Sequence, residues 1–154
     1  MPRQFFETKS TSATREPDNK KALDFKIDHK AITELGQFTA YASVFGNADW
    51  YGDVVEKGAF KKTIKNHKAN DSMPALLWQH DTDEVCGKIL EAKEDDYGLL
   101  ITGQFNLESD CGKNTYATVK AGDVKTLSIG FNTMAWEPID VKSPFDGRRL
   151  LELE

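Results

Sequence analysis

The stretch TLSIGF at residues 126–131 places one hydroxyl in an otherwise apolar, strand-like run. A buried hydroxyl without a hydrogen-bond partner costs roughly 2 kcal/mol or more, so a serine in such a run is normally bonded to another group. A second apolar run, at residues 75–79, ends at His80. If the imidazole of His80 is the partner of Ser128, the serine becomes a nucleophile; if the partner is a backbone carbonyl, the serine is structural.

Around these two runs, the pattern of apolar residues predicts a mostly β chain. Alternating or continuous apolar residues indicate strands around 23–27, 38–45, 75–80, 85–92, 99–107, 124–132, 133–139 and 149–154. An amphipathic helix is expected over 58–68, and a second helix between an N-cap at Ser109 and a C-terminal Gly122. About seven strands and two helices predict a mainly β, α+β fold, arranged as a single antiparallel β-barrel.

Length and composition predict one domain that binds neither nucleic acid nor a membrane. The chain has 154 residues, of which 39% are hydrophobic and 29% charged, and a net charge of −5, which disfavours phosphate contacts. It contains no signal-peptide core and no run of about 18 apolar residues. Residues 1–20 are polar and predict a flexible arm, whereas 21–154 form the domain. The strand that begins near Leu150 indicates truncation at the C-terminus.

Other reactive side chains give weaker patterns. Cys86, Cys111 and His80 lack the close spacing of zinc ligands, so no metal is expected, and no phosphate-binding glycine loop is present. Without an export signal, both cysteines are expected to be reduced thiols. Cys111 is the alternative nucleophile, although a cysteine on a helix usually serves packing. His67 is the alternative to His80 as a base.

Four segments together resemble the tailed-phage prohead protease family, which shares a fold with herpesvirus assemblin. The first comprises YASVFG at 41–46, DxxGDVV at 49–55 and GAF at 58–60, and the second is LLWQHD at 76–81. The third begins with YGL at 97–99 and continues through Gly103 and Leu107, and the fourth is AGDVKTLSIGF at 121–131. The order is that of the family over residues 36–152, and chance does not readily produce four such segments in order.

The resemblance implies a serine endopeptidase. Ser128 would be the nucleophile and His80 the general base, with Glu152 as the acid that orients the imidazole and Glu154 and Glu137 as alternatives. Gly130 would either admit the substrate backbone or serve packing.

The family also implies the substrate and the setting of the reaction. The substrate would be the scaffolding segment of the major capsid protein, and then the protease itself, inside the immature procapsid in the host cytoplasm. No cofactor is implied, and the analogy with assemblin-like enzymes, which work as dimers, suggests a homodimer. Two alternatives remain, a non-catalytic capsid-assembly module and a hydrolase of small esters.

Overall fold

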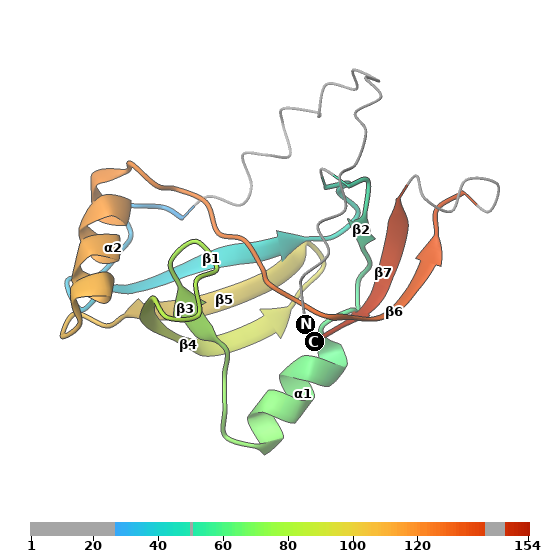
Figure 1. The fold of residues 1–154 in the computed structure, drawn as a ribbon, viewed down its shortest axis with the longest axis horizontal. Helices are drawn as coiled ribbons and strands as arrows, with labels where there is room; N and C mark the ends of the chain where they lie inside the picture. Colours follow the sequence, from blue (N-terminus) through green and yellow to red (C-terminus); the bar gives the residue numbers. More distant parts are fainter. Residues whose placement is uncertain (1–26, 50, 141–146) are drawn as a thin grey trace, which may run out of the picture.

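The computed structural model describes residues 27–49, 51–140 and 147–154, which form two β-sheets and two helices (Figure 1). The predicted arm at 1–20 and most of the predicted strand at 23–27 lie outside the described residues. No helix in the described part of the chain is both long enough and apolar enough to span a bilayer.

The larger sheet has four antiparallel strands in the order β1-β5-β4-β3. Their bounds are Gln37–Val44 for β1, Ala75–Leu77 for β3, Val85–Glu94 for β4 and Gly98–Phe105 for β5. Strand β1 alternates as its sequence predicts, with Phe38, Ala40 and Ala42 buried on one face. The tight β4–β5 turn is closed by Asp95, whose Oδ1 accepts hydrogen bonds from the backbone N–H groups of Tyr97 and Gly98.

The smaller sheet has three strands in the order β2-β7-β6. Strand β2, Val54–Val55, is parallel to β7, Arg148–Leu153, and β7 is antiparallel to β6, Thr133–Pro138. The predicted single antiparallel barrel is therefore wrong, although the mainly β composition with two helices is confirmed. Across the described residues the two sheets keep separate edges, because the segment at 127–131 joins neither of them.

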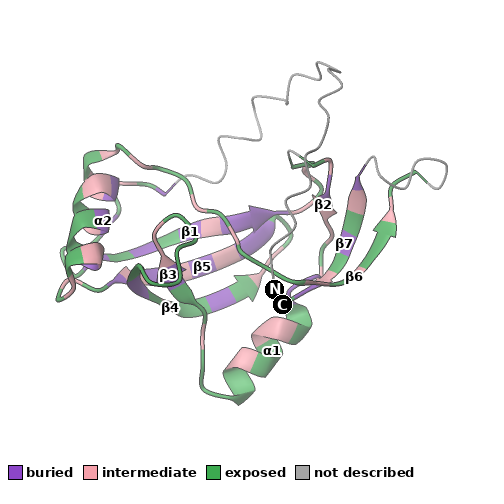
Figure 2. Ribbon diagram, in the orientation of Figure 1, coloured by how far each residue is buried: buried purple, intermediate pink, exposed green. Residues whose placement is uncertain are grey.

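The two helices differ in how well the sequence located their ends. Helix α2, Asp110–Ala121, is confirmed at both ends: the Ser109 hydroxyl accepts from the Gly112 N–H at 3.1 Å, and Gly122 is left-handed at φ 81°. Helix α1, Lys61–Ala69, begins three residues later than expected. None of its residues is buried, and it projects from the body of the molecule (Figure 2).

An ion pair between the buried Asp53 and the half-buried Arg148 joins the loop before β2 to the start of β7. The side chain of Asp53 is 6% exposed and accepts from the backbone N–H of Arg148 at 2.9 Å and from its guanidinium. The carboxylate raises the pKa of the Arg148 guanidinium. Because this pair joins residues 95 positions apart, it helps to fix the small sheet.

Candidate active site

His80 lies in a tight turn. The prediction that it ends a strand is therefore wrong. Strand β3 ends at Leu77, and the backbone N–H of Asp81 donates to the carbonyl of Trp78 at 2.9 Å. The two central residues, Gln79 and His80, have φ angles of 52° and 60°. These values define a type I′ turn, which normally carries asparagine and glycine at its centre. Non-glycine residues pay of order 1 kcal/mol for this conformation, so the turn holds His80 at a local energetic cost.

Ser128 lies on a segment that crosses from α2 to β6 past the four-stranded sheet (Figure 1). Leu127 and Ile129 are half-buried against the core, while Ser128 and Gly130 are exposed. The burial therefore alternates as in an extended chain. The prediction of a strand over 124–132 is nevertheless wrong for residues 127–131, which pair with neither sheet among the described residues.

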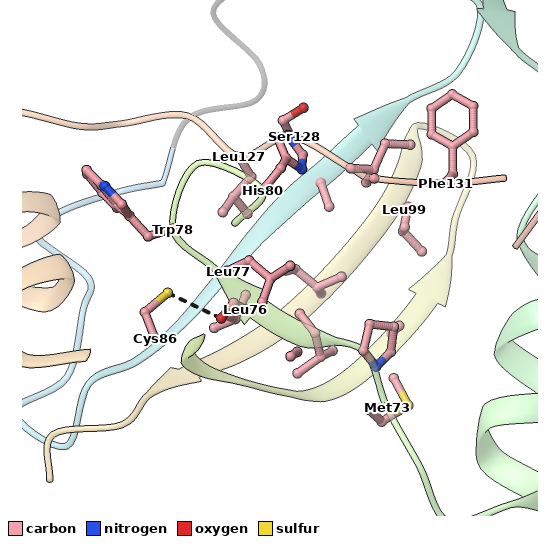
Figure 3. A pocket seen from close by; sticks show the side chains of 18 of the residues that line it. Met73, Leu76, Leu77, Trp78, His80, Cys86, Leu99, Leu127, Ser128 and Phe131 are labelled. Atoms are coloured by element: carbon pink, nitrogen blue, oxygen red, sulfur yellow. Dashed lines mark hydrogen bonds between the residues drawn. The ribbon is translucent and has the colours of Figure 1, made fainter. Parts of the chain in front are cut away.

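The turn and this segment meet at the imidazole of His80. A Cβ atom built on Gly130 would lie 3.4 Å from His80 Nδ1, so the ring packs directly against the backbone two residues after Ser128. Figure 3 draws both Ser128 and His80 among the residues that line one pocket. The two residues do not lie on two strands of one barrel, and no hydrogen bond joins their side chains in the described structure. Serine–histidine pairs are often loose before substrate binds.

Ser128 and His80 both line one cavity of about 510 Å³. The residues of β1, β3, β4 and β5 that line it are all apolar or cysteine, and Leu127, Ile129 and Phe131 contribute from the Ser128 segment. Figure 3 shows Leu76 and Leu77 of β3 below the Ser128 segment. The candidate nucleophile and base thus border an apolar pocket of a size typical for ligands.

The three acids proposed to orient His80 occupy different places. Glu152 Oε1 lies 2.7 Å from Lys62 Nζ, and its side chain is 31% exposed. Glu154 lines the same cavity as His80, whereas Glu137 lies 3.9 Å from Arg149. In the described part of the chain no carboxylate is hydrogen-bonded to His80.

The alternative reactive residues are placed less favourably. His67 lines the same cavity, but its Nδ1 lies 3.2 Å from Ser72 Oγ in a local contact at the end of α1. Cys111 does not line the cavity, and burial raises the pKa of its thiol. Burial likewise raises the pKa of Cys86, which disfavours the nucleophilic thiolate at both cysteines. The described residues contain no cluster of three or more potential metal ligands.

The sequence did not determine which group lies against Gly130. In the structure, the imidazole ring of His80 lies where a side chain of Gly130 would point. The signal was the glycine itself, two residues beyond the candidate nucleophile, but the partner required the spatial position of the turn.

The chain is similar in sequence to three curated phage proteins. The chain is 32% identical over 120 residues to the prohead protease of Enterobacteria phage HK97, a match that covers 75% of this chain and 52% of that protein. It is 28% identical over 110 residues to the prohead protease of Escherichia phage T5, covering 70% of this chain and 50% of that protein. It is 35% identical over 127 residues to the capsid polyprotein of Pseudomonas phage PAJU2, covering 77% of this chain and 16% of that protein.

The chain therefore spans about half the length of the two prohead proteases it matches. No solved structure matched it. The sequence model of the caudovirus prohead serine protease family matches residues 21–154, which is most of the chain and includes His80 and Ser128. The chain belongs to the caudovirus prohead serine protease family.

Proposed function

We propose that this protein is a serine endopeptidase that cleaves the scaffolding segment of the phage major capsid protein during procapsid maturation. The observation that carries the proposal is that Ser128 and His80 line one apolar cavity, with the imidazole of His80 against Gly130, two residues after Ser128. Family membership supports the reaction class. A relative named capsid polyprotein supports a substrate in the capsid. The reaction would take place inside the immature procapsid, and the protease would also cleave itself.

The reaction assigns one role to each of the two residues. Ser128 Oγ attacks the carbonyl carbon of the scissile bond while His80 accepts the hydroxyl proton. The tetrahedral intermediate collapses to an acyl-enzyme, and His80 returns the proton to the departing amine. Water, deprotonated by His80, then releases the acyl group and restores the serine. The exposed position of Ser128 suits a nucleophile that must meet a peptide chain.

The direct test is cleavage of the capsid protein precursor by matched variants. Ser128→Ala should abolish cleavage, because loss of the nucleophile in a serine protease costs about 10⁶ in rate. Ser72→Ala is the control, since Ser72 also lies beside a histidine, His67. Cleavage that survives in Ser128→Ala would place the nucleophile elsewhere, with Cys111 the first candidate. Absence of cleavage by the wild type would favour the alternative of a non-catalytic capsid-assembly module. Hydrolysis of activated esters without proteolysis would favour a small-ester hydrolase.

Glu152 is proposed as the acid that orients His80, and its ion pair with Lys62 provides a control. Glu152→Gln should slow cleavage while leaving measurable activity, because an orienting acid matters less than the nucleophile. Lys62→Met breaks the same ion pair but keeps the carboxylate, so it should leave the rate close to wild type. If Glu154→Gln slows cleavage instead, the acid is Glu154. Equal, undiminished cleavage by all three variants would rule out both acids.

A further inference from the structure

The cavity beside Ser128 and His80 is larger than the catalytic pair requires. Its volume is about 510 Å³. A dry cavity of about 150 Å³ lined by apolar side chains holds one benzene-sized group, so this one has room for roughly three such groups. A single substrate side chain would leave most of it empty.

The chemistry of the lining selects what can enter. The floor consists of sheet side chains such as Phe38, Leu76 and Ile101, all of them buried. Among the described lining residues there is no lysine or arginine, and Glu154 is the one carboxylate. A charged substrate side chain would lose its hydration here without a matching partner on the floor, whereas an apolar one would not.

The position of Ser128 selects which part of a substrate reaches the cavity. Leu127 and Ile129, the two neighbours of Ser128, both line it, and so does Leu77 across from them. All three are half-buried, so the cavity is reached from the surface beside the nucleophile. In an extended peptide, side chains two residues apart point to the same side and lie roughly 7 Å from each other.

We propose that this cavity binds two large apolar side chains at alternating positions of an extended substrate segment next to the scissile bond. The inference rests on the proposed function and names its specificity: leucine, methionine or phenylalanine at two positions separated by one residue. The segment passes Ser128 with these two side chains pointing toward β3 and β5.

The test measures binding, so that it does not depend on catalysis. The full chain carrying Ser128→Ala is titrated calorimetrically with peptides of about eight serine and threonine residues. One peptide carries two leucines at alternating positions, one carries two adjacent leucines, and one carries alanines in their place. Removing even one methylene from a pocketed side chain lowers recognition by about 10- to 200-fold. We expect the alternating leucine peptide to bind at least fivefold more tightly than both others.

Variants of the lining then locate the binding site. Leu77→Phe and Met73→Phe fill opposite ends of the β3 side of the cavity and should each reduce the preference for leucine at least fivefold. The control is Leu151→Phe, a 41% exposed leucine outside the cavity, which should keep the preference. Two filling variants are used so that failure of one to fold leaves the other.

A smaller preference for the alternating peptide, no binding of any peptide, or equal loss in Leu151→Phe would overturn the inference. Failure of the proposed function is distinguishable, because it appears as precursor cleavage that does not depend on Ser128 while peptide binding is unaffected.

Discussion

Gly130 permits a graded perturbation of the candidate active site without touching the catalytic side chains. Its φ angle is not in the left-handed region and the residue is exposed, so the backbone and the core accept a side chain there. A Cβ atom would stop 3.4 Å from His80 Nδ1, close to ordinary contact distance. Gly130→Ala should therefore keep cleavage within about threefold of the wild type.

Valine at the same position adds two carbons, each about 1.5 Å beyond Cβ. A methyl directed toward the imidazole would approach it more closely than contact permits, so we expect the ring to be displaced by about 1 Å. A misplacement of this size costs about 100-fold in rate. We expect kcat/KM to fall about 100-fold in Gly130→Val, with an unchanged melting temperature.

The assay pairs cleavage kinetics with thermal unfolding, and Asn132→Val is the control. Asn132 is exposed on the same segment and does not line the cavity. If Gly130→Val cleaves as fast as the wild type, His80 does not act from this position and the reasoning is refuted.

Two further predictions concern the scaffold. Asp53→Ala leaves the Arg148 guanidinium and N–H without their acceptor. Because Arg148 is 37% exposed, we expect the free energy of unfolding, measured in urea, to fall by about 3 kcal/mol, the low end for buried pairs. A loss below about 1 kcal/mol would show that the pair does not hold β7. Tyr41 donates a 2.6 Å hydrogen bond that lowers the pKa of Asp95, so this bond stabilises the fold above the ordinary pKa and is lost as pH falls through the lowered one. Tyr41→Phe should move the acid-unfolding midpoint to higher pH, and an unmoved midpoint would contradict this role.

Local signals in the sequence located the elements whose stability is local. Ser109 and Gly122 marked the ends of α2 because an N-cap hydroxyl and a left-handed glycine act within a few residues of the helix. The β4–β5 hairpin followed from two apolar runs around a turn containing Asp95. These features require no knowledge of distant parts of the chain.

The errors concern pairing between distant segments. The turn at Gln79–His80 contains no glycine, so the apolar run before it was extended through His80. Simple alternation along β7 would put Leu151 and Leu153 on one face, but the register shifts next to Trp136 and leaves Leu151 as an extra residue. Leu150 and Leu153 are therefore the buried pair. A bulge of this kind depends on the partner strand and has no marker in the sequence of β7.

The geometry around the candidate residues could not be predicted from the sequence. Ser128 and His80 both line one cavity, yet they lie on an unpaired segment and in a type I′ turn and not on two strands. The acid was the least predictable member, because its position depends on where β7 lies relative to α1, where Glu152 meets Lys62.

The central claim is that Ser128 is the nucleophile, and a fluorophosphonate tests it most directly. This reagent phosphonylates an activated serine by displacement of fluoride, and digestion with mass spectrometry then identifies the modified residue. The account predicts one modified residue, Ser128, with labelling greatly slowed in His80→Ala. Labelling of Ser72 instead, or equal labelling of Ser128 with and without the imidazole of His80, would contradict it.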